Sequence, residues 1–314
     1  MTITPQDRKQ PAEPRPQRPP IVVGVDGSPS SLVATEWAAD EAIRQGSPLQ
    51  LVYAYPANAL HEPPTAPIGR RRAEMVFETV RERLVTPRYS GLTITTRAQQ
   101  GAPRRVLRHI AGNAGMLVLG RQHTGRVAEL VHLSTSVPAA AKDGAVPVTV
   151  VPMEGVPPQD PPFVVLGADG SARSKAAVAH AFAMAGSLGA RLVAVTGIDA
   201  PEGYSEGRHL GERWGQLVEK AATQQAEILD AFRGMYPGVQ VEAVVDERSP
   251  AQALGHYAAG ADRVVIGGRG HGLLTGAFLG SVARAVLRDM PCPVTVVHAH
   301  GGEHDNGKGV DDDA

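Results

Sequence analysis

The chain has 314 residues, of which 42% are hydrophobic and 20% charged, and this length suffices for two globular domains. Its net charge of −1 argues against a dedicated binder of nucleic acid or of an anionic membrane, because either partner requires a basic face. A single cysteine, Cys292, excludes an intramolecular disulfide framework. No apolar run reaches membrane-spanning length and the first twenty residues show no signal peptide, so we expect a cytoplasmic protein.

Three segments of the chain occur twice, in the same order and at nearly constant spacing. They are residues 21–28 (IVVGVDGS) and 163–171 (FVVLGADGS), 116–121 (MLVLGR) and 263–269 (RVVIGGR), and 147–151 and 293–297 (both PVTVV). Coincidences in register of this kind indicate that the chain is a tandem duplication.

The composition around the repeats predicts the domain boundaries. Residues 1–20 are Pro-rich and are expected to form a disordered tail, and residues 299–314 an acidic, glycine-rich tail. Residues 152–162 (PMEGVPPQDPP) contain five prolines and indicate a semi-stiff linker. The first domain then covers 21–151 and the second covers 163–298.

Within each copy the pattern alternates strands with helices. An apolar strand leads into Asp-Gly-Ser, and the helix that follows ends at Gly46 in the first copy and Gly189 in the second. A second strand, a longer charged helix and a third strand come next, and Pro103 or Pro250 then opens another helix. A fourth strand, a helix from Ser134 or Ser281 and a fifth strand complete the unit.

Nearly all-apolar strands separated by helices predict an α/β fold, with an open, parallel, five-stranded sheet in each copy and helices on both faces. In Rossmann-like sheets of this kind, ligands bind beyond the carboxyl ends of the strands, where the strand order reverses. Glycine-rich turns follow the first and fourth strands of each copy. These two strands are therefore expected to flank the ligand crevice.

The second copy carries a phosphate-binding pattern after its fourth strand. Residues 267–270 (GGRG) are followed by nine residues and then by 280–282 (GSV). A glycine turn lets backbone N–H groups converge on an anion, and the helix that opens at Ser281 presents its N-terminal N–H groups and dipole to negative charge. Arg269 adds a cationic contact at the rim. The alternative is that these glycines follow the strand for steric reasons alone.

The spacing Gly-x-x-Gly-x9-Gly-Ser after the fourth strand, with Asp-Gly-Ser after the first, resembles the ATP-binding class of the universal stress protein family. The resemblance covers both repeats and is closest to the tandem-domain form of the family. It implies a fold like that of the adenine nucleotide α-hydrolases, an internal pseudo-dimer, and adenine-nucleotide binding in a stress response. The residues it implies in the second domain are Asp169 for ribose or adenine, the Gly197 backbone for the base, and Gly267, Gly270, Gly280, Ser281 and Val282 for ribose and phosphates.

The first copy departs from this pattern. Asp26, Gly120 and Ser134 are retained, but His123 and Leu133 stand where the second copy has glycines. A Cβ atom at those positions obstructs the close backbone approach that a phosphate needs. We expect the three retained residues to form a weak site at most. In both copies, the aspartate has the alternative role of closing the Asp-Gly-Ser turn without any ligand.

The leading hypothesis is an ATP-binding regulatory protein of the stress response, in which Mg²⁺ accompanies the phosphates and protein side chains alone form no metal site. No catalytic residue is predicted, because no P-loop lysine and no carboxylate aimed at an attacking water is present, although slow ATP hydrolysis stays open. The alternatives are a nucleotide-independent interaction scaffold and a weak ATPase, and cyclic AMP competes with ATP as ligand. The protein partner is unknown.

Three further features have structural interpretations. The fifth strands, 148–151 and 294–297, are edges through which the repeats pack, either within one chain or between two chains as a homodimer. Cys292 lies between two prolines and is expected to be a packed residue and not a reactive thiol. His298 and His300 are expected to belong to a solvated tail and not to a transition-metal site.

Overall fold

The computed structural model describes residues 18–56, 66–121, 146–171, 174–199, 208–268 and 279–298. The first half contains β1 (Ile21–Gly24), α1 (Pro29–Gln45), β2 (Leu49–Tyr55), α2 (Ala66–Leu84), the 3-10 turn η1 (Pro87–Tyr89), β3 (Ile94–Gln100), α3 (Pro103–Ala111), β4 (Met116–Arg121) and β5 (Val148–Pro152). The second half contains β6 (Phe163–Gly167), α5 (Lys175–Leu188), β7 (Arg191–Gly197), α6 (Arg208–Arg233), β8 (Val241–Asp246), α7 (Pro250–Tyr257), β9 (Arg263–Gly267), α8 (Ser281–Asp289) and β10 (Val294–Val297).

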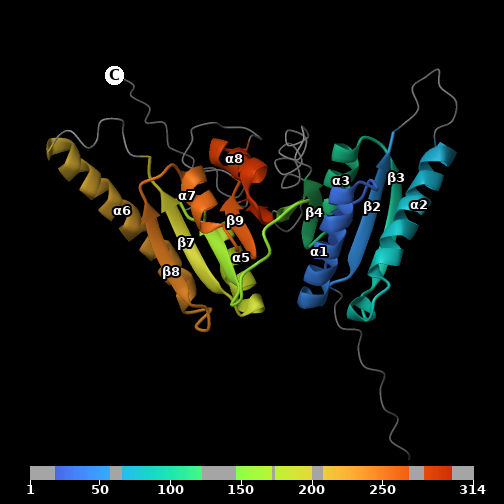
Figure 1. Ribbon diagram of the computed structural model, residues 1–314, viewed down its shortest axis with the longest axis horizontal. Coiled ribbons are helices and arrows are strands. Elements are labelled where there is room, and N and C mark those ends of the chain that lie inside the picture. The colour runs from blue at the N-terminus through green and yellow to red at the C-terminus, as the bar shows by residue number, and fades with distance from the viewer. Residues whose placement is uncertain are drawn as a thin grey trace, which may run out of the picture.

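The strands form one ten-stranded sheet in the order β3-β2-β1-β4-β5-β10-β9-β6-β7-β8. Each half is parallel, as predicted, and the halves meet where β5 pairs with β10 in antiparallel register. The two lobes lie side by side, with α2 at the outer edge of one and α6 at the outer edge of the other (Figure 1). The predicted fold class is confirmed, and the two five-stranded sheets are joined within the chain.

The helix boundaries follow local sequence chemistry. The Ser28 side chain caps α1 by accepting a hydrogen bond from the Ser31 amide at 3.3 Å. Helices α1 and α5 end at Gly46 and Gly189, both with φ of 62°, the left-handed conformation that glycine adopts without steric cost. Pro103 opens α3 and Pro250 opens α7, also as predicted.

Each half buries apolar side chains on both faces of its sheet. In β1, Ile21 and Val23 pack with α1 and α2, while Val22 packs with α3 on the other face. In β6, Val164 packs with α5 and α6, while Val165 packs with α7 and α8. The strict alternation explains why both faces of these strands read as apolar in the sequence.

The packed face of α6 differs from the one that the apolar spacing suggests. Leu217 would share an apolar stripe with Ile228, but its side chain is 51% exposed. Trp214 and Gln225 are buried instead, and the Gln225 Nε2 donates to the carbonyl oxygens of Ala194 at 3.0 Å and Val244 at 3.2 Å. A buried glutamine that satisfies strand carbonyls thus takes a core position that apolar periodicity does not reveal. No helix in the described ranges is long and apolar enough to cross a bilayer.

Candidate functional site

The strand order reverses in each half at the position where the sequence predicts the ligand crevice. In the second half, β6 pairs with β7 on one side and β9 on the other, so the chain runs outward from β6 in both directions. Because these strands are parallel, the turn that contains Asp169, the end of β7 at Gly197 and the end of β9 at Gly267 share one edge of the sheet. In the first half, β1 and β4 pair in the same way. The first and fourth strands of each copy are therefore neighbours, as two strands that flank a ligand crevice have to be.

The helix α8 begins beside the end of β9. The Gly280 amide donates to the Gly268 carbonyl oxygen at 3.3 Å, and the Gly268 amide donates to the Val297 carbonyl at 2.9 Å. Gly268 and Gly280 therefore lie side by side at the end of β9. Gly280 occupies the N-cap position of α8 and has no side chain with which to cap it. The first N–H groups of α8, at Ser281 and Val282, thus lie where an anion can accept from them.

Two of the predicted binding residues of the second domain, Arg269 and Gly270, lie outside the described residues. In the first domain, Ser134, His123 and Leu133 lie outside them as well. The structure therefore brings Asp169, Gly197, Gly267 and the start of α8 to one edge of the sheet, and the rest of the predicted loop stays a prediction.

The aspartate of each Asp-Gly-Ser segment closes its own turn. Asp169 Oδ1 accepts hydrogen bonds from the Ser171 amide at 3.0 Å and from the Ser171 hydroxyl at 2.8 Å. In the first domain, Asp26 Oδ1 accepts from the Ser28 amide at 2.9 Å. The same turn occurs in both copies, which supports the interpretation of these aspartates as turn-forming residues. A ligand contact by Asp169 remains a proposal.

The glycine at position 197 has a packing explanation. A Cβ atom there would lie 2.5 Å from the Pro250 Cα and 3.0 Å from the Arg248 carbonyl oxygen. The start of α7 therefore packs directly on the end of β7, and only glycine fits. This contact accounts for the residue type at Gly197 without any nucleotide base, so a base contact by its backbone is also a proposal.

One further residue of this edge, His298, is not where the sequence pattern predicted. His298 is only 7% exposed and does not belong to a solvated tail. Its ring packs on Gly268, where a Cβ atom would lie 2.1 Å from the His298 Cε1. The available signal was its position directly after β10, the neighbour of β9 in the sheet. His298 therefore forms part of the support beneath the segment that starts at Gly268.

The corresponding edge of the first domain is built differently. A Cβ atom at Gly120 would lie 2.2 Å from the Ser30 carbonyl oxygen, because the first turn of α1 packs on the end of β4. The next residue, Arg121, aligns with Gly268 of the second domain. The packing of α1 explains the glycine at position 120 without a ligand.

Arg121 reaches across to the second domain. Its side chain is buried, and Nη1 donates to the Leu287 carbonyl at 2.7 Å and to the Arg288 carbonyl, while Nη2 donates to the Met290 carbonyl. Burial lowers the pKa of the Arg121 guanidinium, which nonetheless stays charged at neutral pH. A cation at these carbonyls complements the negative end of the α8 dipole. The first domain thus holds the C-terminus of the helix whose N-terminus faces the candidate site.

Cys292 is a packed residue, as predicted. Its side chain is buried, and burial raises the pKa of the thiol to about 12. The thiol is therefore protonated at neutral pH and is a poor nucleophile.

Comparison with known proteins identifies the family. The sequence profile of the Universal stress protein family matches residues 18–152 and again residues 164–298. A universal stress protein of Mycolicibacterium smegmatis is 31% identical over 288 residues, which covers 88% of this chain and 96% of that protein. The universal stress protein Rv1996 of Mycobacterium tuberculosis is 32% identical over 303 residues, which covers 88% of this chain and 94% of the length of Rv1996.

Solved structures show the same fold. The crystal structure of a universal stress protein from Archaeoglobus fulgidus DSM 4304 superposes with a TM-score of 0.61 at 17% identity, covering 91% of this chain and 98% of that one. A functionally unknown protein from Pseudomonas aeruginosa superposes with a TM-score of 0.55 at 17% identity, covering 90% of this chain and 93% of that one. The profile matches to both halves and the relatives over most of the chain agree with the internal duplication. The chain belongs to the universal stress protein family, and it carries two domains of that family in tandem.

Proposed function

We propose that this universal stress protein is an ATP-binding regulatory protein whose nucleotide is held by the second domain. The observation that carries the proposal is the start of α8. Gly280, which has no side chain to cap the helix, is tied to Gly268 at the end of β9 and lies at the edge where β6 and β9 adjoin. A helix N-terminus at the reversal point of a parallel sheet is suited to phosphate, because its N–H groups and dipole both favour an anion.

The neighbouring residues fit the remainder of a nucleotide. The Ser281 hydroxyl would donate to a phosphate oxygen, with Arg269 and Gly270 contributing from the preceding loop. The Asp169 turn and the end of β7 at Gly197 lie along the same edge and would contact ribose and base. Mg²⁺ would be held chiefly by phosphate oxygens, as is usual for this ion beside a nucleotide.

The residues of this edge bind and orient, and none is assigned a chemical step. Backbone N–H groups and a serine hydroxyl can neutralise phosphate charge, but efficient hydrolysis also requires a group that positions an attacking water. We therefore propose that nucleotide occupancy acts through stability, assembly or partner choice in the cytoplasm. The scaffold and the weak ATPase are the competing outcomes of the test.

The test is isothermal titration of ATP with Mg²⁺ into nucleotide-free protein and into Gly280→Leu, which introduces the residue that the first domain carries at Leu133. We expect about one ATP per chain for the wild type and none for Gly280→Leu, because a bulky side chain would block phosphate from the α8 terminus. Gly215→Leu is the matched control, since Gly215 lies on α6 and a Cβ atom added there would have no neighbouring atom within 4 Å. This variant should bind ATP as the wild type does.

Circular dichroism establishes that each variant is folded. An absence of binding to the wild type would reject the proposal in favour of a scaffold, and two sites per chain would reject the assignment to the second domain. ADP formation in a single-turnover assay with enzyme in excess would favour the weak ATPase.

A further inference from the structure

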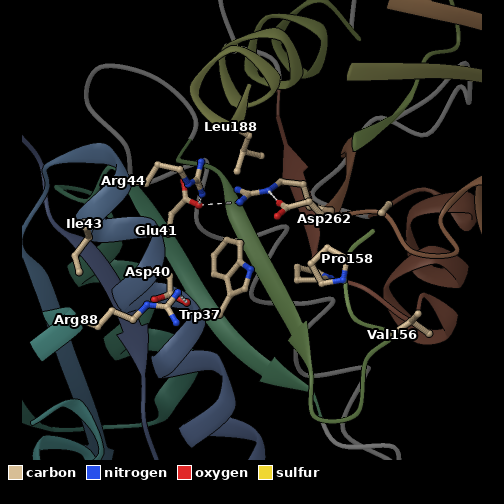
Figure 2. A pocket seen from close by; sticks show the side chains of 13 residues that line it. Trp37, Asp40, Glu41, Ile43, Arg44, Arg88, Val156, Pro158, Leu188 and Asp262 are labelled. Atoms are coloured by element: carbon tan, nitrogen blue, oxygen red, sulfur yellow. Dashed lines mark hydrogen bonds and ion pairs between the residues drawn. The ribbon is translucent and has the colours of Figure 1, made fainter. Parts of the chain in front are cut away.

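A cavity of about 570 Å³ lies where the two domains meet, away from the candidate nucleotide site. The C-terminal ends of α1 and α5 converge there, and the Arg44 Nη1 of α1 donates to the Ser187 Oγ of α5 at 3.0 Å. Figure 2 shows Glu41 and Trp37, from α1, and Asp262, from the segment before β9, reaching this cavity from opposite sides. Residues far apart in the chain thus form one polar cluster between the domains.

The centre of this cluster is Arg263, the first residue of β9. Its Nη2 lies 2.9 Å from Glu41 Oε2 of the first domain, and its Nε lies 2.8 Å from Asp262 Oδ1. The guanidinium also stacks over the Trp37 ring at 4.8 Å. The side chains of Arg263 and Glu41 are only 2% and 1% exposed. Each of these buried charges also has a partner in its own domain, because Arg263 pairs with Asp262 and Glu41 pairs with Arg44. The contact between Arg263 and Glu41 joins these two pairs into one buried network across the domains.

The duplication shows which residues occupy the related positions in the other domain. The Asp-Gly-Ser turns and the glycines that end α1 and α5 align the two helices, so that Glu41 matches Met184 and Trp37 matches His180. The ends of β4 and β9 likewise match Arg263 with Met116. The positions equivalent to Glu41 and Arg263 in the other domain are thus both occupied by methionine.

The domains are related by an approximate two-fold axis at the β5–β10 pair. Thr149 and Thr295 are equivalent residues of the two repeats, and they face each other with their hydroxyl oxygens 2.9 Å apart. A two-fold axis makes the same contact twice when the two partners are identical. Here the partners are not identical: Arg263 contacts Glu41, whereas the residues at the equivalent positions are Met116 and Met184, and the Met184 sulfur lies 3.5 Å from Arg263 Nη1.

We infer that Arg263 and Glu41 make the two domains non-interchangeable, so that the surface around β10 accepts the first domain and rejects a second copy of itself. Pairing of two second domains would bury two Arg263 side chains opposite Met184 and His180, without Glu41. Pairing of two first domains would bury two Glu41 carboxylates beside Met116. Each homotypic pair loses the ion pair that joins the two domains and keeps only the pairs within a domain, Arg263 with Asp262 or Glu41 with Arg44. The loss of this buried contact disfavours the wrong partner.

The contact made by Arg121 acts in the same direction. The equivalent residue of the second domain is Gly268, which has no side chain to reach the C-terminus of a partner's α8. A pair of second domains would therefore lose this cap as well as the charge pair. The partner that fits is the unlike domain, either of the same chain or of another copy exchanged through the linker.

The first arm of the test is a double-mutant cycle on the full chain with Glu41→Met, Arg263→Met and the double variant, since methionine is the residue that the chain itself holds at both equivalent positions. Each single variant should lower the Tm by about 2–12 °C, because it removes one member of the buried network and leaves Arg263 with Asp262 only, or Glu41 with Arg44 only. The double variant should lose much less than the sum. Arg191→Met and Glu242→Met are the matched control, because that ion pair at 2.8 Å is exposed and should give small, additive effects.

The second arm measures partner choice. A protease site is inserted between Glu154 and Gly155 in the linker, and the folded chain is cut there into its two domains. The cut protein is incubated until the proportions of like and unlike domain pairs no longer change. Native mass spectrometry then measures these proportions. The wild type should contain only pairs of a first with a second domain. The Glu41→Met/Arg263→Met variant should also contain like pairs, in smaller amounts than unlike pairs, because Arg121 still favours the unlike partner. Like pairs or separated halves in the wild type, or only unlike pairs in the double variant, would overturn the inference. Additive effects in the first arm would overturn it too.

Discussion

The two domains share one fold but use the position after the fourth strand in different ways. In the second domain, Gly268 allows the His298 ring to pack on the backbone and ties the start of α8 to the sheet. In the first domain, Arg121 holds this position and extends to three carbonyls at the C-terminus of α8. The second domain thus uses this position to start the proposed ligand loop, and the first domain uses it for a side chain that caps the C-terminus of α8. Gly268 and Arg121 thus occupy the same place in their sheets, but the residue type at each is determined by the groups that pack against it.

The helices α1 and α5 differ in a similar way. Trp37 stacks on Arg263 at the interface, whereas His180 at the equivalent position is buried and its Nε2 has no hydrogen-bond partner among the described residues. Burial, with a smaller contribution from the nearby Arg263 charge, lowers the pKa of His180 to about 4. His180 is therefore neutral at physiological pH. The second domain contains an acid-sensitive position where the first contains an aromatic stacking surface.

The largest expected effect concerns His180. Its pKa in the folded protein, about 4, lies below the ordinary value of 6.5, so the unfolded chain binds more protons between these values. Stability is therefore complete above pH 6.5 and falls as the pH drops toward 4, by about 3 kcal/mol in total. His180→Phe should remove this part of the pH dependence in urea unfolding followed at several pH values. An unchanged slope in the variant would show that other groups produce the acid sensitivity.

Arg121→Met should be next in size, because it removes a charged donor from three carbonyls and leaves them buried. We expect a loss of about 2–3 kcal/mol in the free energy of unfolding. The proposed ATP affinity should also fall several-fold, since α8 loses the contact that holds its C-terminus. Arg121→Lys is the intermediate control, because lysine keeps the positive charge but lacks the planar guanidinium that donates to several carbonyls at once. A destabilised variant with unchanged ATP affinity would limit Arg121 to a role in stability.

Gly268→Ala tests the packing beneath the loop. A Cβ atom would overlap the buried His298 ring, and the expected cost is about 1–2 kcal/mol. In the background of His298→Ala, the same substitution should cost much less, because the ring that it meets is gone. Urea unfolding of the four proteins gives the coupling between the two positions. Equal costs in both backgrounds would contradict the packing explanation of this glycine.

Ser281→Ala should have the smallest effect and sharpens the assignment of the ligand site. Loss of one hydroxyl donor to phosphate should weaken ATP binding by about 1 kcal/mol, or roughly five-fold, with little change in stability. Isothermal titration measures the affinity, and AMP is the comparison ligand. A larger loss for AMP than for ATP would place the hydroxyl near the α-phosphate, and no loss for either would remove Ser281 from the site.

The sequence by itself determined the duplication, the alternation of strands and helices, and the helix ends at Gly46 and Gly189. These features depend on residues a few positions apart, where apolar periodicity, proline and glycine have direct conformational consequences. The start of α8 at Ser281 was predictable for the same reason.

Only the tertiary structure decided what each domain does with its equivalent positions. Arg121 meets a carbonyl 166 residues away, and Arg263 meets a carboxylate 222 residues away, so no local pattern identifies either partner. The burial of His298 and of Gln225 likewise depends on strands that are distant in sequence. Long-range contacts of polar side chains follow from how the sheets join, and β5 paired with β10 is the contact that brings these residues together.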